Sequence, residues 1–340
     1  MFDFSPWLDL PLIWSLLIAT AIFLYVLLDG FDLGVGILFP FAPSDECRDR
    51  IMHSVAPFWD GNQTWLVLGG GGLLAAFPLA YAILLPAFYI PIISMLMGLI
   101  LRGVAFEFRF RANTEATRQL WTYAFHFGSL IATLCQGMML GAFVQGVRVS
   151  GRNFSGGPFD WASAFSLMTG IALVFGYALL GATWLIMKTQ GLTQAWARKV
   201  TAYALIFVGI FMGLVSLIMP MLNPSIAQFW FSTPNIYYLL PIPMLSAIFF
   251  VLITYDLYTG KSEYRPFFAS MGLFLMGYLG LGLSIFPWII PFQFDIWQAA
   301  SATTSLSLML VGVVPLLPLI LGYTAYAYYV FRGKTQDHYE

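Results

Sequence analysis

Charged side chains are scarce in this 340-residue chain. Only 9% of the residues are Asp, Glu, Lys or Arg, whereas 60% are hydrophobic. An ordinary soluble domain has roughly 25% charged residues, which cover its surface, while a bilayer accepts apolar side chains on lipid-facing helices. The composition therefore excludes a soluble fold. The net charge is −1 and no basic patch forms, so we expect no nucleic-acid partner.

Cysteine and histidine are rare as well. Cys47 falls in a predicted cytoplasmic loop and Cys135 in a predicted span, and neither makes a CxxC pair, so no disulfide framework is expected. A bis-histidine haem site needs two histidines at matching depth in a bundle. Of the three histidines only His126 is predicted to lie inside a span. We therefore expect no haem or metal ligand set in this chain.

What the chain does contain is long apolar runs. Each is about 20 residues, the length of a membrane-spanning helix and not of a β-barrel strand. They predict an all-α, polytopic membrane protein of about nine transmembrane helices, forming a single transmembrane domain over residues 1–340. The expected spans are 9–28, 54–75, 79–101, 120–145, 162–187, 199–221, 237–256, 266–286 and 304–330. The division between the second and third stays open, because GGGG at Gly69–Gly72 and Pro78 interrupt one apolar stretch.

The basic residues predict the orientation of these spans. All Lys and Arg residues except Arg148 and Arg152 fall in loops or tails that follow odd-numbered spans. Basic residues are enriched in cytoplasmic loops. The N-terminus is therefore predicted outside and the C-terminus in the cytoplasm.

Charges at membrane depth are costly, and they are the first candidates for function. Asp29 and Asp32, in DGFDLGVG, are three residues apart and would share a helix face if the first helix continues. Asp60 follows Trp59 in PFWDGNQTW at the start of the second span, and Arg102 closes the third, just before Glu107. On the predicted topology these residues all fall near one depth, on the cytoplasmic side.

Two interpretations of these residues stay open. A carboxyl such as Asp60 or Glu107 beside Arg102 could take up and release protons, because burial and a nearby guanidinium shift its pKa in opposite directions. Alternatively, Asp29, Asp32 and Asp60 cap helices or pair with Arg102 and only fix the packing of the first three spans.

The motifs DGFDLGVG, PFWDGNQTWL and LRGVAFEFR together resemble subunit II of the cytochrome bd-type quinol oxidases, including the cyanide-insensitive branch. The resemblance extends over the whole chain in length and span count. It implies a heterodimer in the bacterial inner membrane that oxidises quinol and reduces dioxygen to water.

The resemblance also implies a division of labour. Haem b and haem d would be carried by the partner, subunit I, which this subunit supports. Some members of the family hold a structural quinone in subunit II, for which the sequence indicates no pocket, and a small single-span subunit joins in some. Membrane lipid is the remaining expected partner.

For the site, the resemblance implies that Asp60 with Trp59 occupies the position of a proposed cytoplasmic proton path towards the haems. Asp29 and Arg102 match family motifs with less defined roles, and Glu107 matches weakly. A proton-coupled secondary transporter using the same carboxylates is the alternative function, although it predicts paired broken helices that the sequence does not show. A purely structural assembly subunit is the third possibility.

Overall fold

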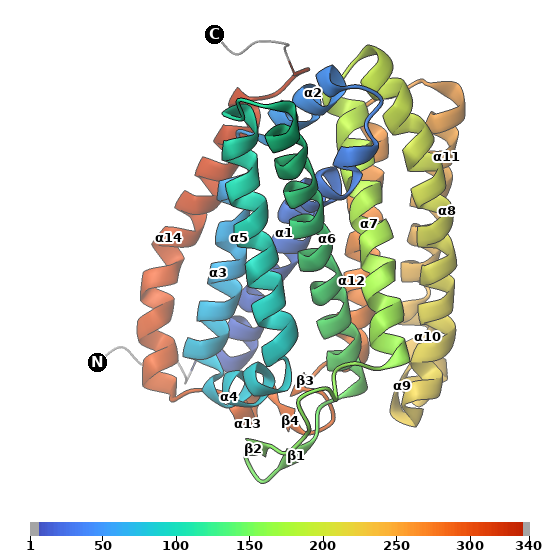
Figure 1. Cartoon of the computed structure of the whole chain (residues 1–340). Coiled ribbons are helices and arrows are strands. Elements are labelled where there is room, and N and C mark those ends of the chain that lie inside the picture. Colours follow the sequence, from blue (N-terminus) through green and yellow to red (C-terminus); the bar gives the residue numbers. More distant parts are fainter. Residues whose placement is uncertain (1–6, 336–340) are drawn as a thin grey trace.

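The structure is a computed structural model that describes residues 7–335, and it is a bundle of long helices (Figure 1). Eight helical segments within this range are long and apolar enough to cross a membrane. They are α1 (Leu10–Leu38, extended to Phe41 by a 3-10 turn), α5 (Tyr89–Phe110), α6 (Glu115–Gln145), α7 (Ala164–Lys188), α8 (Gly191–Leu222), α10 and α11 (Asn235–Leu239 and Pro241–Thr259), α12 (Arg265–Ile285) and α14 (Thr303–Val330). The all-α membrane fold is thus confirmed.

The second expected span is present as helix α3 (Trp59–Ala76), which packs along α1. It is not among the eight, because its first turns carry Asp60, Asn62 and Gln63 and its middle is GGGG. In Figure 1, α1 begins at the lower end of the bundle and α14 ends at the upper end, an arrangement that requires an odd number of passes. Helix α3 is the candidate for the additional pass, and the count of nine stays a prediction.

The predicted third span, 79–101, is wrong in its boundaries. The chain instead forms the short helix α4 (Pro78–Ala87), breaks at Phe88, and then continues as α5 to Phe110. Pro86, near the end of α4, removes one backbone donor just before the break. Arg102 therefore lies in the interior of α5 and does not close it, and Glu107 lies on the same helix.

The remaining elements cover the two ends of the bundle. Helix α2 (Asp45–Val55) lies across the upper end in Figure 1, so the connection between α1 and α3, where Cys47 was predicted, contains a helix. The opposite end carries two small antiparallel hairpins and short helices (Figure 1). These elements are β1 (Val149–Ser150), β2 (Asn153–Phe154), β3 (Trp288–Ile290), β4 (Phe294–Asp295), α9 (Pro224–Phe231) and α13 (Ile296–Ala299).

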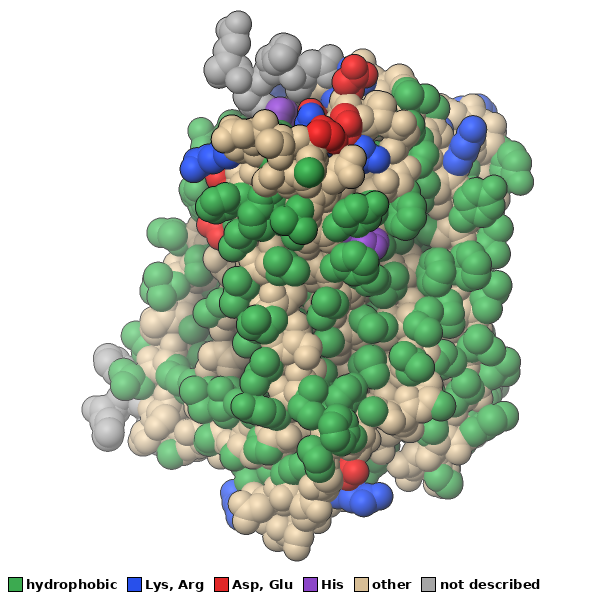
Figure 2. All heavy atoms as spheres, viewed as in Figure 1, with side chains coloured by type: hydrophobic (Ala, Val, Ile, Leu, Met, Phe, Trp, Pro, Cys, Tyr) green, Lys and Arg blue, Asp and Glu red, His purple; other side chains and the backbone are tan. Residues whose placement is uncertain are grey.

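The surface agrees with a membrane location. Figure 2 shows hydrophobic side chains over most of the visible face, with charged side chains gathered mainly at its two ends. More of them lie at the α2 end, which is the predicted cytoplasmic side. The orientation itself stays a prediction.

Helix α1 lies at the centre of the fold, in contact with α3, α6 and α7. Helix α1 is buried without interruption from Asp29, where the DGFDLGVG segment begins, through Leu38. Gly34 brings α1 against α7 so closely that a Cβ there would lie 1.8 Å from the backbone oxygen of Tyr177. Gly181 makes the reciprocal close approach from α7. Small residues at such contacts let helix backbones meet in a membrane, where hydrophobic driving force between helices is absent.

Candidate functional site

The central feature of the site is one arginine facing two carboxylates. Helix α1 continues through the DGFD motif, which places Asp29 and Asp32 about one turn apart on the side that meets α5. Arg102 Nη1 donates to Asp29 Oδ1 at 2.8 Å, and its Nη2 lies 3.9 Å from Asp32 Oδ2. All three side chains are at most 1% exposed. The predicted meeting of these groups at one depth is therefore observed for Asp29, Asp32 and Arg102.

Helices α3 and α14 extend this cluster on one side. The Asn62 amide nitrogen donates to Asp32 Oδ2 at 2.7 Å and to the Leu28 carbonyl at 3.1 Å. The Asn62 oxygen accepts from the Tyr328 hydroxyl at 3.0 Å. Asn62 thus uses both ends of its amide to join α1, α3 and α14.

Helices α6 and α7 extend it on the other side. Tyr25, one turn before Asp29 on α1, accepts a hydrogen bond from the Gln136 side-chain nitrogen at 2.7 Å. The Gln136 oxygen in turn accepts from the Tyr177 hydroxyl at 2.9 Å. Since Tyr25 accepts from Gln136, its own hydroxyl proton remains available to another acceptor.

Several buried polar atoms of this region have no partner among the described residues. They are Asp29 Oδ2, Asp32 Oδ1, Arg102 Nε and Thr133 Oγ1. Thr133 lies between Ser129, which faces Gly36 of α1, and Gln136, so all three share the side of α6 that faces α1. Buried polar atoms are normally hydrogen-bonded to protein or ordered water. The cluster therefore has unused hydrogen-bonding capacity inside the bundle.

Asp60 does not join this cluster, which corrects the expected pairing with Arg102. It is exposed in the first turn of α3, and it makes no ion pair or side-chain hydrogen bond with residues 7–335. Its neighbour Trp59 turns inward, where its ring packs on Phe106 of α5 at 5.4 Å and lies against Gly103. Glu107, next to Phe106, is also exposed. Asp60 and Glu107 thus flank the α3–α5 contact on the outside, while Arg102 faces the inside.

Besides Asn62, which lies in the PFWDGNQTW motif but was not proposed as a site residue, four residues of the network were not identified as candidates from the sequence. Each of the four is an isolated polar side chain in an apolar run of the sequence: Tyr25, Gln136, Tyr177 and Tyr328. The signal that could have found Tyr25 is its position one turn before Asp29 on a helix expected to carry function. Gln136 was detectable as the amide side chain near the middle of a long span.

The described histidines do not fit a haem site. His126 Nδ1 lies 2.9 Å from the Ile37 carbonyl oxygen, and its ring packs on Phe41 and Phe127. His53 lies in α2 with its ring against Phe110 at 5.0 Å. The two imidazoles therefore face different neighbours and form no axial pair in residues 7–335. His338 lies outside the described residues.

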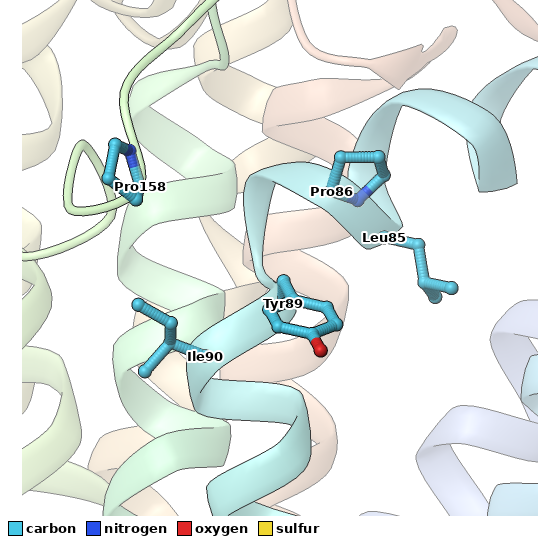
Figure 3. Close-up of a pocket in the computed structure, with 5 residues that line it drawn as sticks. All are labelled: Leu85, Pro86, Tyr89, Ile90 and Pro158. Carbon is cyan, nitrogen blue, oxygen red and sulfur yellow. The ribbon is translucent and has the colours of Figure 1, made fainter.

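An apolar cavity of about 520 Å³ lies at the other end of the bundle, at the break between α4 and α5. It is lined by Leu85, Pro86, Tyr89, Ile90 and Pro158 (Figure 3). Among these five described lining residues, the Tyr89 hydroxyl is the only polar side-chain group. The cavity is therefore separate from the buried carboxylates, which lie towards the α2 end.

Comparisons with known proteins agree on one family. Residues 10–331 match the family model described as cytochrome bd terminal oxidase subunit II. Subunit 2 of the cytochrome bd-I ubiquinol oxidase of Escherichia coli K12 is 30% identical, with 96% of this chain and 95% of that protein covered. Subunit 2 of the cytochrome bd ubiquinol oxidase of Bacillus subtilis is 28% identical, with 95% and 96% covered.

A solved structure shows the same fold. The bd oxidase of Geobacillus thermodenitrificans contains a chain that superposes with a TM-score of 0.72 at 18% sequence identity, covering 95% of this chain and 99% of that one. At this identity the likeness concerns the fold alone.

Proposed function

The chain belongs to the cytochrome bd terminal oxidase subunit II family, and on this premise we propose a role for its buried and exposed carboxylates in the oxidase. The family places it in the bacterial inner membrane as one subunit of a quinol oxidase, a complex that oxidises quinol and reduces dioxygen to water. The match removes the reason to prefer a proton-coupled transporter.

The complex contains haem and a partner subunit, as the family implies. We assign haem b and haem d to that partner, subunit I, because the described histidines here do not fit axial ligation. A small single-span subunit and a structural quinone are finer assignments that rest on the family resemblance alone.

The exposed face of α3 is the surface that we assign to the partner. Asp60, Thr64, Val67, Gly71 and Leu74 form one exposed stripe along this helix. Its middle is a groove of about 390 Å³ lined by Thr64, Val67, Leu68, Gly71 and Gly72. A carboxylate facing hydrocarbon is costly, and small residues let a second helix approach closely. Both features favour a protein neighbour over lipid.

On this assignment Asp60 delivers protons across the subunit contact. Reducing dioxygen consumes protons, and taking them from the cytoplasm while quinol protons leave outside separates charge without a pump. Asp60 is suited to this step because it is accessible, lies on the stripe that we assign to the partner and pairs with no arginine among the described residues. The helices next to Asp60 are positioned by Trp59, which packs α3 against α5, and by Arg102, which joins α5 to Asp29 of α1. Glu107 lies on the outer side of the contact between α3 and α5.

The competing role of Asp60 is local. A carboxylate in the first turn of a helix interacts favourably with the helix dipole, typically by 0.3 to about 1 kcal/mol. Asp60 occupies such a position in α3. A purely structural Asp60 would therefore affect the stability of α3 and leave turnover unchanged.

Asp60→Asn in the purified complex separates the two roles. We expect quinol-driven oxygen consumption to fall several-fold while the haem spectrum and the partner content stay at wild-type values. Glu115→Gln is the matched control, since Glu115 is an exposed acid in the first turn of α6. Unchanged oxygen consumption in Asp60→Asn would remove Asp60 from the proton route.

A further inference from the structure

The charges in the buried cluster do not balance. Asp29 and Asp32 contribute two carboxylates and Arg102 contributes one guanidinium, and all three are at most 1% exposed. With both acids ionised the cluster would carry a net charge of −1 inside the bundle. An uncompensated charge in such surroundings is expensive, and the usual response of a buried acid is to take up a proton.

Within residues 7–335, the helices packed around the pair supply no second cation. The groups that face it are Tyr25 from α1 itself, Asn62 from α3, Gln136 and Thr133 from α6, Tyr177 from α7 and Tyr328 from α14. All of these are neutral. The charged groups that act on Asp32 are Arg102 and Asp29. Charge balance therefore has to be reached within the pair.

The hydrogen bonds distinguish the two acids. Asp29 receives the direct Arg102 contact at 2.8 Å, and a charged donor of this kind favours an ionised carboxylate. Asp32 lies 3.9 Å from Arg102, accepts one hydrogen bond from the neutral Asn62, and has its Oδ1 free. Each acid keeps one oxygen without a described partner, Asp29 Oδ2 and Asp32 Oδ1, so the Arg102 contact is what distinguishes them. The charge therefore lies on Asp29, and the proton can reside on Oδ1 of Asp32.

We propose that Asp29 and Asp32 together hold one proton at neutral pH, with Asp29 ionised against Arg102 and Asp32 neutral. The chain then has a proton-binding carboxyl within the membrane, at the junction of six helices. The proton belongs to the coupled pair, so removing Asp29 transfers the role of ionised partner to Asp32. This site goes beyond the proposed delivery of protons by Asp60 and does not depend on it.

Infrared spectroscopy of the purified complex tests the proposal, because a protonated carboxyl has a C=O stretching band that carboxylates lack. We expect Asp32→Asn to remove one such band at neutral pH. Asp29→Asn also removes it, since Asp32 then ionises against Arg102. Arg102→Gln has the opposite effect: with no cation both acids are protonated, and the band increases about twofold.

Asp256→Asn is the control. Asp256 is also fully buried, but Arg265 pairs with it one to one, so its charge is balanced without a proton and we expect its replacement to leave the carboxyl band unchanged. Absence of any band that responds to Asp32→Asn would overturn the proposal. A melting temperature that depends on whether sodium or a bulky organic cation is present would then identify a bound cation as the balancing charge.

Asp32→Glu covers the case in which the amide variants do not assemble. It keeps the carboxyl and changes its surroundings, so the proton remains and the frequency of the band shifts. A spectrum identical to wild type would contradict a neutral acid at position 32. Asp60→Asn leaves the band unchanged in every case, which keeps this test separate from that of the proton route.

Discussion

Arg102 and Asp29, 73 positions apart in the sequence, join α5 to α1 through a 2.8 Å contact between Nη1 and Oδ1. Both side chains are buried. A buried ion pair adds little net stability over apolar packing, but removing one partner leaves the other charge uncompensated. The pair therefore makes the packing of these two helices sensitive to either residue.

Replacing the arginine exposes this sensitivity. We expect Arg102→Gln to lower the free energy of unfolding of the purified complex by about 3 kcal/mol, because Asp29 loses its charged partner. Unfolding followed by tryptophan fluorescence measures the change. Arg111→Gln, at the exposed end of α5, is expected to stay within about 0.5 kcal/mol of wild type. Equal stability of the two variants would show that the buried pair does not fix the packing.

The close contact between α1 and α7 requires glycine at position 34, because glycine has no Cβ. In Gly34→Ala the new carbon would lie 1.8 Å from the Tyr177 backbone oxygen, and backbone cannot move aside as a flexible side chain can. We expect a loss of about 3 kcal/mol or more, seen as low recovery of folded chain. Gly213→Ala in α8 is the control, since nothing lies within 4 Å of its Cβ position. Normal recovery of Gly34→Ala would contradict the close contact.

The sequence was sufficient to identify the acids and arginine of the buried cluster. Asp29, Asp32 and Arg102 are charges inside apolar runs, and the cost of such charges makes them stand out. The three-residue spacing placed the two acids on one face, and the continuation of α1 to Leu38 confirms the prediction. The predicted common depth holds because odd and even spans run in opposite directions.

Which of the acids Asp29, Asp32 and Asp60 pairs with Arg102 could not be predicted in the same way. Depth says nothing about which side of a helix faces inward, and α3 is apolar nearly all round apart from its first turns. Asn62 faces Asp32 and Asp60 faces outward, although they are only two residues apart. The C-terminal end of α5 was also predicted too early, because the charged residues Arg102 and Glu107 indicated the end of a span. In the structure Arg102 lies inside the bundle, where Asp29 and Asp32 balance its charge.

Helix α2 is held to the bundle by one carboxylate shared between two arginines. Asp49 accepts from Arg109 Nη1 at 2.7 Å and from Arg118 Nη2 at 2.7 Å. Burial alone would raise the pKa of Asp49, but the hydrogen bonds from the two guanidinium groups outweigh it and hold the pKa below its usual value. Such a carboxylate stabilises the folded state above its unfolded pKa, about 3.9, and stops doing so as the pH falls through the lower folded value.

The lowered pKa of Asp49 predicts how the stability of the Asp49→Asn variant depends on pH. At neutral pH we expect its melting temperature to lie below that of wild type, by an amount equivalent to about 1 kcal/mol or less because Asp49 is partly exposed. Below about pH 4 the two melting curves converge, since wild type loses the same contribution. Asp45→Asn, whose acid pairs with Arg48 on the surface, is the control. A gap that stays constant with pH would rule out an ionised Asp49 as its cause.

Two lysines hold the last described residues against the end of α7. Lys188 Nζ donates to the carbonyls of Phe331 and Gly333, and the Thr335 amide donates to the Lys188 carbonyl. Lys334 Nζ reaches the carbonyls of Ile186 and Thr189, and it pairs with Glu263.

Lys334→Met removes the contacts of Lys334 with Ile186, Thr189 and Glu263 and leaves those of Lys188 in place. We expect the Lys188 hydrogen bonds alone to be too few to hold residue 335. The carbonyls at the C-terminal end of α7 lack helical partners and attract cations, so this lysine contributes through both its charge and its donors. We expect faster hydrogen exchange at the Thr335 amide, measured by mass spectrometry, with oxygen consumption unchanged. Arg332→Gln is the matched control, because Arg332 stacks on Tyr329 at 3.9 Å on the exposed side. Equal exchange in both variants would mean that the segment is held by its backbone and by Lys188 alone.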